Sequence, residues 1–163
     1  MSIPQYPEKW AHRSAIEPDD FCAYARERGT APRHRLPETM FIVFSGALFS
    51  GFRYGREADW TDVAANMTIL GALTSARVGV ARSTIGAPAA AALMEELLAY
   101  GAKRIITVGT AGALVESFAI GGGFVCGQAV RDEGVSHHYA PHDRAARPDA
   151  QLTEALGRSI EAA

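Results

Sequence analysis

Two glycine-rich segments and one polar loop hold the residues of this 163-residue chain that are best suited to chemistry. The first segment, 83–88, reads STIGAP, and the second, 109–112, reads GTAG. Glycine lets backbone N–H groups approach an anion or a sugar without an intervening Cβ atom. The first segment also opens a predicted helix, whose free N–H groups favour an anion. Such segments either bind a ligand or only turn the chain, and their spacing does not decide between the two.

The polar loop at 131–139 reads RDEGVSHHY and combines a fixed cation, two carboxylates and two imidazoles. These groups could hydrogen-bond a polar ligand and transfer protons near neutral pH. A solvated loop whose charges pair with one another is the plainer interpretation, and the sequence alone favours it. Neither a metal site nor a serine nucleophile is predicted, because the H-E-x-x-H and G-x-S-x-G spacings are absent.

An alternation of apolar runs and helical patterns predicts how these segments are positioned. Residues 40–44 and 104–108 have the continuous apolar character of buried strands. Between them, 86–101 is predicted to be a helix, with Pro88 in its first turn and Gly101 at its end. A strand, a helix and a strand in this order favour a parallel crossover, and therefore an α/β fold.

The remaining elements rest on shorter patterns. A short helix is expected to begin at Pro18 and to end by Gly29, and residues 47–65 fit neither helix nor strand clearly. A hairpin is expected from two strands at 67–73 and 77–83. A further strand is expected at 124–130, and a last helix at 149–163.

Composition predicts one globular domain over 1–163, with an N-terminal arm and helix in 1–36 and the α/β core in 37–163. Hydrophobic residues make up 48%, and 16 Lys and Arg against 18 Asp and Glu give a net charge of −2. This balance argues against a nucleic-acid polymer as partner. Two cysteines, no signal peptide and no apolar run of ~20 residues predict a cytoplasmic protein without a membrane partner.

Several blocks of sequence resemble the nucleoside phosphorylase/uridine phosphorylase family, in the family's order and at its spacing. The blocks are IGAPAAA at 85–91, EL at 96–97, GAK at 101–103, VGTAG at 108–112 and VRDEGVSHHYAP at 130–141. The resemblance implies a central mixed, partly barrel-like β-sheet flanked by helices, in a protein that forms homo-oligomers. It also implies that the chain lacks the family's C-terminal third, which supplies the grip on the ribose hydroxyls.

The activity that the resemblance implies is that of a pentosyltransferase. Such an enzyme cleaves the N-glycosidic bond of a purine or pyrimidine (uridine-like) nucleoside with phosphate, giving the base and ribose 1-phosphate. Nucleoside and phosphate are the implied ligands, with no further cofactor and no metal. Two alternatives are a nucleosidase that uses water and a non-catalytic remnant that binds a nucleoside or only assembles with partner chains.

The resemblance also assigns residues to the site. Thr110 matches the family's Ser or Thr that contacts phosphate and ribose, and Ala111 and Gly112 match the backbone beside ribose and base. Gly86, where the predicted helix opens, completes the substrate- and phosphate-binding group. The loop near the base end of the pocket contributes Arg131, Glu133 and His138.

Two arginines that bind phosphate in this family have no counterpart at the matching positions. The segment 44–48, FSGAL, lacks the Arg of the family's Gly-Asp-Pro-x-Arg-like motif, and Thr107 stands where the second Arg is expected. Losing both removes charge-assisted contacts to an oxyanion. Arg53, Arg82 or an Arg from a partner chain could substitute for them.

Overall fold

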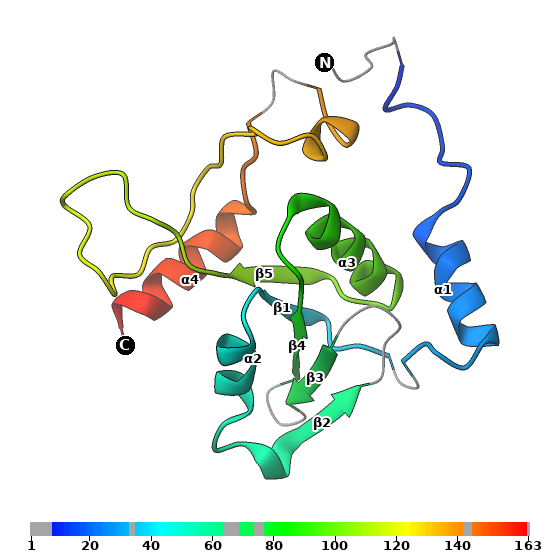
Figure 1. The fold of residues 1–163 in the computed structure, drawn as a ribbon, viewed down its shortest axis with the longest axis horizontal. Helices are drawn as coiled ribbons and strands as arrows, with labels where there is room; N and C mark the ends of the chain where they lie inside the picture. Colours follow the sequence, from blue (N-terminus) through cyan, green and yellow to red (C-terminus); the bar gives the residue numbers. More distant parts are fainter. Residues whose placement is uncertain (1–7, 33–34, 64–68, 74–76, 142–144, 163) are drawn as a thin grey trace. The chain divides into compact units, whose positions relative to one another are not determined.

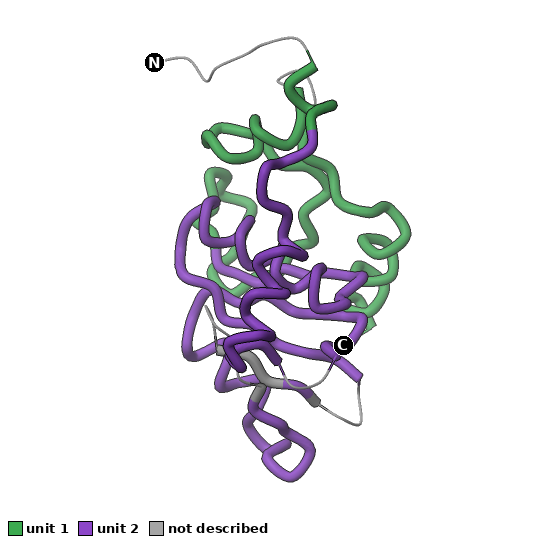
Figure 2. The backbone as a smooth tube through the Cα atoms, turned by 90° about the vertical axis from the view of Figure 1, so that its right-hand side faces the viewer, with its two compact units in different colours: residues 1–12, 111–163 green, residues 13–110 purple. Residues whose placement is uncertain are grey.

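The computed structural model describes residues 8–32, 35–63, 69–73, 77–141 and 145–162. The chain divides into two compact units, which are described separately below and coloured in Figure 2. We call residues 13–110 the sheet unit, and residues 1–12 with 111–163 the second unit. The organisation of 1–163 as a single domain stays a prediction.

The sheet unit is built on one mixed five-stranded β-sheet (Figure 1). Its strands are β1 (Thr39–Val43), β2 (Trp60–Val63), β3 (Ile69–Leu73), β4 (Val78–Arg82) and β5 (Arg104–Val108). They lie in the order β2-β3-β4-β1-β5. β4 and β5 both pair with β1 in parallel, whereas β3 is antiparallel to β2 and to β4. The α/β class and the mixed sheet are therefore confirmed, but over the described strands the sheet is open instead of barrel-like.

The structure contains four α-helices and two 3-10 turns among the described residues. They are α1 (Pro18–Glu27), α2 (Gly46–Arg53), η1 (Glu57–Asp59), α3 (Ala87–Ala99), η2 (Ser136–His138) and α4 (Ala150–Glu161). α1 begins at Pro18 and is followed by Gly29 with φ +69°, as the sequence predicts. Gly101 has φ +107° after α3, and the Asp149 side chain accepts a hydrogen bond from the Leu152 N–H at the start of α4.

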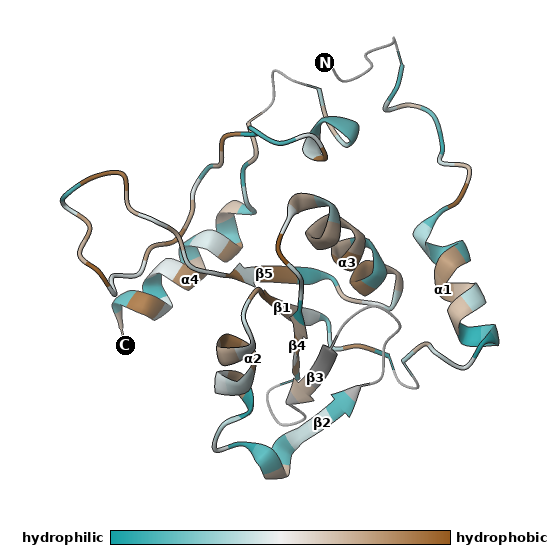
Figure 3. Ribbon diagram, viewed as in Figure 1, coloured by the Kyte–Doolittle hydropathy of each residue, from teal (hydrophilic) through white to brown (hydrophobic). Residues whose placement is uncertain are grey.

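Helices pack on both faces of the sheet. Successive side chains of β1 point to opposite faces, so the strand contacts a helix on each side. Met40 and Ile42 share one buried cluster with Leu97 of α3. Phe41 points to the opposite face, where its ring lies 5.1 Å from that of Phe52 on α2. Figure 3 shows apolar residues along β1, β4, β5 and α3. The first residues after β1, β4 and β5 are thus held on a core that is packed on two sides.

The structure departs from the sequence expectations, or completes them, in three segments. The strand expected at 124–130 is wrong: the segment forms only an isolated bridge from Ala129 to Ala146, because no strand of its own unit lies beside it within the described residues. Residues 104–108 form the expected strand but not a fully buried one, since β5 is an edge of the sheet. The ambiguous stretch 47–65 contributes to α2, η1 and β2.

The expected hairpin is confirmed as the antiparallel pair β3–β4, whereas its turn at 74–76 lies outside the described residues. Among the helices of the described part of the chain, none has the length and apolar character that crossing a bilayer requires.

Candidate functional site

The parallel strands β4, β1 and β5 end at the same edge of the sheet. Each is followed by a short segment rich in glycine or hydroxyl side chains: 44–46 after β1, 83–86 after β4 and 109–110 after β5. β1 lies between the other two strands, so neighbouring segments are about 5 Å apart and the outer two about 10 Å apart. Ligands of open α/β sheets bind at this edge. The structure therefore places Gly86 and Thr110 together at one edge of the sheet unit.

Gly86 occupies the N-cap position of α3 in a conformation that only glycine adopts readily, with φ 120° and ψ 146°. No side chain caps this helix. The first N–H groups of an α-helix have no partner within the helix, and here Pro88 has no N–H to contribute. The N–H groups of Ala87 and Ala89 are thus available to water or to an anion, which the positive end of the helix dipole favours.

The start of α2 brings a cation to the same edge. Ser45 caps α2, because its hydroxyl accepts a hydrogen bond from the Leu48 N–H at 3.1 Å. A Cβ atom built on Gly46 would lie only 3.2 Å from Nη1 of Arg82, the last residue of β4. Glycine at this position therefore makes room for the guanidinium beside the first turn of α2. The start of α2 therefore combines a capped helix N-terminus with a guanidinium.

Backbone contacts hold the segments that follow β4 and β5. The N–H of Ser83 donates to the carbonyl of Val43 at 2.9 Å, and the Ser83 hydroxyl donates to the carbonyl of Thr84 at 2.8 Å. A Cβ atom on Gly109 would lie 3.5 Å from the ring of Phe44, which is ordinary contact. Thr110 follows directly and is exposed. Its hydroxyl is thus presented on a supported backbone, as a ligand-binding group requires.

The other two residues of the predicted substrate group belong to the second unit. Ala111 and Gly112 are both exposed, and nothing lies within 4 Å of a Cβ atom built on Gly112. A side chain would therefore fit at position 112 in the chain as it stands.

The polar loop of the second unit is closed by Arg131. Its Nε donates to the Ser136 hydroxyl at 3.0 Å, and its Nη2 donates to the carbonyls of Ser136 and Ala140 at 2.7 and 2.8 Å. Nη1 donates to the carbonyl of Pro141. The guanidinium is therefore engaged by its own loop, which supports the structural interpretation of Arg131.

His137 completes this closure, and the two remaining predicted residues differ in their surroundings. Nδ1 of His137 lies 3.2 Å from Nη2 of Arg131, and its Nε2 lies 3.2 Å from the Arg131 carbonyl. The carboxylate of Glu133 accepts hydrogen bonds from the N–H groups of Val135 and Ser136. The Ser136 side chain first, and then these backbone contacts, lower the pKa of Glu133. His138 is exposed. Of the three loop residues predicted for the base side, His138 is the one that the loop itself does not use.

From the sequence, Arg82 was only one of several possible replacements for the missing phosphate arginines, although its charge and its position at the end of a predicted strand were evident. The missing information was that Gly46 leaves space for it, which depends on the pairing of β1 with β4. Among the described residues, no group of three or more His, Cys, Asp and Glu side chains could hold a metal ion.

Comparison with known proteins identifies the family of this chain. Residues 47–163 match the family model of the phosphorylase superfamily. The chain is similar to the uridine phosphorylase of Treponema pallidum, with 37% identity over 95 residues, which are 58% of this chain and 37% of that protein. For the uridine phosphorylase of Thermococcus kodakarensis the identity is 40% over 86 residues, 53% of this chain and 30% of that protein.

A relative with a different name matches a similar stretch. The guanosine phosphorylase of Halorubrum lacusprofundi is 38% identical over 74 residues, which are 45% of this chain and 31% of that protein. These matches span about a third of the length of the curated relatives. The resemblance seen in the sequence is confirmed by the family model, which covers more than half of the chain. This chain belongs to the phosphorylase superfamily.

Proposed function

We propose that this chain carries the phosphate- and ribose-binding part of a nucleoside phosphorylase. The observation that carries the proposal is that the superfamily match, 47–163, includes the segments after β4 and β5 that meet at one edge of the sheet. The relatives are named for uridine and for guanosine, so the proposed substrate is a uridine-like or purine nucleoside. A homo-oligomer and the absence of a further cofactor remain predictions.

In the proposed reaction an oxygen of inorganic phosphate attacks C1′ of the ribose. The C1′–N bond breaks, its electron pair leaves with the base, and the products are the base and ribose 1-phosphate. The transition state places a cationic ribosyl group between an anionic nucleophile and the leaving group, so donors that hold the phosphate beside C1′ lower the barrier by positioning it. This chain would supply the N–H groups at the start of α3, the Thr110 hydroxyl and the Arg82 guanidinium.

Arg82 is the proposed replacement for the two phosphate arginines that the sequence lacks at Leu48 and Thr107. It reaches the start of α2 from β4, whereas the family pattern places one Arg after β1 and the other in β5. A guanidinium is suited to an oxyanion because it offers two parallel N–H donors.

The first test measures phosphate binding by the 163-residue chain. Phosphate should raise its melting temperature relative to chloride at equal ionic strength, since a ligand that binds only the native state stabilises it. The Arg82→Gln variant should bind phosphate about tenfold to a hundredfold more weakly, as expected for lost hydrogen bonds to a charged group. Gly46→Ala, whose methyl group displaces the guanidinium, should weaken binding in the same direction. Thr110→Ala should cost about tenfold or less.

Equal phosphate affinity in all four proteins would overturn the role of Arg82 and Thr110. The second test follows release of uracil from uridine, and of guanine from guanosine, with and without phosphate. Release that depends on phosphate supports the phosphorylase.

Release of base at the same rate without phosphate would establish the second candidate, a nucleosidase that uses water. The observation that favours this candidate is the absence of arginine at Leu48 and at Thr107.

A further inference from the structure

A carboxyl group is buried without a partner in the sheet unit, away from the strand ends. Glu96 on α3 is 6% exposed, and neither of its carboxyl oxygens has a hydrogen-bond partner. An ionised carboxylate in such a place has lost its hydration without any compensating hydrogen bond, so the protonated form is favoured. Burial accordingly raises the pKa of Glu96.

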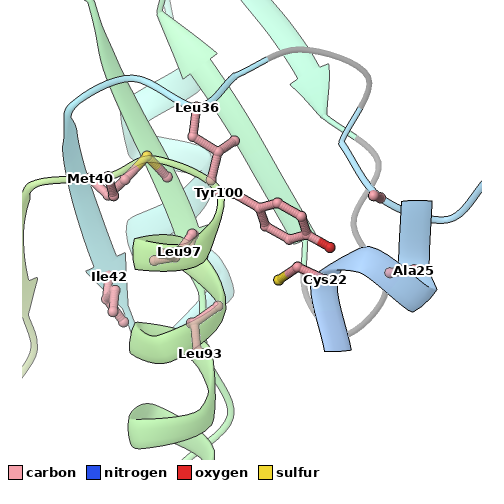
Figure 4. Close-up of a cluster of buried hydrophobic side chains, with 11 residues drawn as sticks. Cys22, Ala25, Leu36, Met40, Ile42, Leu93, Leu97 and Tyr100 are labelled. Carbon is pink, nitrogen blue, oxygen red and sulfur yellow. The ribbon is translucent and has the colours of Figure 1, made fainter. Parts of the chain in front are cut away.

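Glu96 lies where α1 packs against α3. Two further buried polar groups share this interface, and Figure 4 shows Tyr100, the C-cap residue of α3, and Cys22 of α1 pointing toward each other. Cys22 is fully buried, and its thiol interacts with the buried hydroxyl of Tyr100. The interface thus holds three polar groups that are most stable when uncharged.

Charged groups near this interface lie on α1 and on Arg35, whose side chain lies against Gly101 beside Tyr100. Asp19 and Arg26 act electrostatically on Cys22, and the Arg26 guanidinium lies 5.5 Å from the centre of the Tyr100 ring. The sheet beneath α3 contributes Met40 and Ile42 to the buried apolar cluster. Burial raises the pKa of both Cys22 and Tyr100, so these two stay neutral at neutral pH. Of the three buried polar groups, Glu96 is therefore the one whose charge changes first as the pH rises from acid.

We propose that α1 is held on α3 by a proton-dependent latch, which is closed while Glu96 is protonated and is weakened when Glu96 ionises. Detachment of α1 would hydrate the carboxylate, which the packed interface does not allow. The latch concerns the helix at residues 18–27 and is independent of the proposed enzymatic activity.

The direction of the pH effect follows from the two pKa values of Glu96. Detached α1 leaves Glu96 near its ordinary value of 4.5, and packing raises it. Docking is therefore strongest below pH 4.5. Between the ordinary and the raised pKa the detached population grows by about tenfold per pH unit, and above the raised pKa it stays constant.

The buried thiol of Cys22 provides a direct measurement of detachment. The other cysteine, Cys126, is exposed, so it is replaced in a Cys126→Ser background. The rate at which a thiol reagent labels Cys22 is measured from about pH 5 to about pH 8 in this protein and in its Glu96→Gln variant. Dividing the first rate by the second removes the pH dependence of the thiol itself, because the glutamine side chain of the variant does not titrate.

We expect this ratio to rise with pH and then to level off at the raised pKa of Glu96. Glu95→Gln is the matched control, because Glu95 precedes Glu96 on α3 but is only partly buried; it should leave the rise unchanged. A ratio that stays within about twofold over the whole range would overturn the latch.

A second measurement keeps the proposal testable if Glu96→Gln does not fold. Amide hydrogen exchange of α1 is compared with that of α2 in the same native sample, so that the intrinsic pH dependence of exchange cancels. The latch requires the ratio of α1 to α2 exchange to rise with pH over the same range, and a constant ratio would contradict it.

Discussion

The strand ends of the sheet unit and the polar loop at 131–139 both offered polar groups to a ligand in the sequence, yet the structure uses these groups differently. In the loop, the guanidinium of Arg131 and the carboxylate of Glu133 are hydrogen-bonded to residues of the same loop. At the strand ends, the first turn of α3 has no side-chain cap and the Thr110 hydroxyl is exposed. A cluster of charged residues is thus a weaker indication of a site than supported backbone with unused donors.

The physical reason lies in what each region must do to be ordered. The loop has almost no strand pairing or helix, so its side chains have to supply the hydrogen bonds that hold it. The segments after β1, β4 and β5 are anchored by the sheet, which already satisfies the neighbouring backbone. Donors such as the first N–H groups of α3 and the Thr110 hydroxyl can therefore serve a ligand.

Replacing Arg131 is expected to give the largest effect on stability. Arg131→Ala removes donors to the carbonyls of Ser136, Ala140 and Pro141, and it should lower the free energy of unfolding by about 2–4 kcal/mol. Urea unfolding followed by circular dichroism measures this. Arg131→Lys should restore only part of the loss, because one ammonium does not reach all of these acceptors. A variant that keeps its full stability but loses nucleoside binding would show that Arg131 binds the ligand and does not hold the loop.

Replacing Gly86 is expected to have the next largest effect. Gly86→Ala forces a Cβ atom into a backbone conformation with φ 120°, at a cost of about 1–3 kcal/mol in unfolding free energy. Space is not the cause, since the nearest atom to that Cβ would be Cδ of Pro88 at 3.8 Å. Gly51→Ala, in the interior of α2 with nothing within 4 Å, is the matched control and should not destabilise the protein. Equal stability of the two variants would show that the turn before α3 is not strained.

Replacing Gly112 should have the smallest effect on stability, and it separates an effect on ligand binding from an effect on folding. Gly112→Val adds a side chain to open, exposed backbone, so the free energy of unfolding should change by less than about 0.5 kcal/mol. Binding of uridine or guanosine should nevertheless be lost, because the resemblance places this backbone beside the ribose and the base. Isothermal titration with each nucleoside checks this, and unchanged affinity would contradict the assignment of Gly112.

Local sequence patterns predicted most of the elements because their signals do not depend on distant residues. Pro18 with Asp20, Pro88 with Gly101, and Asp149 all mark helix ends that the structure confirms. The expected strand at 124–130 failed for the opposite reason. A strand needs a neighbour to pair with, and a β-like run of residues does not reveal whether one exists.

The candidate site divides in the same way. Gly86 and Thr110 were identified from glycine spacing and family resemblance, and the topology places both at the carboxyl edge of the parallel strands. The position of Arg82 beside Gly46 could not be predicted, since the two residues are far apart in the chain and meet only because β4 pairs with β1. Likewise, the closure of the loop by Arg131 depends on the path of its backbone.

By itself the sequence determined the α/β class, the ends of most helices and the membership of the phosphorylase superfamily. These properties follow from local propensities and from motifs that keep their spacing along the chain. Only the tertiary structure decided which polar groups are already satisfied, that Arg82 reaches the start of α2, and that Glu96 is buried without a partner. Burial and hydrogen bonding are set by residues far apart in sequence, so no local pattern contains them.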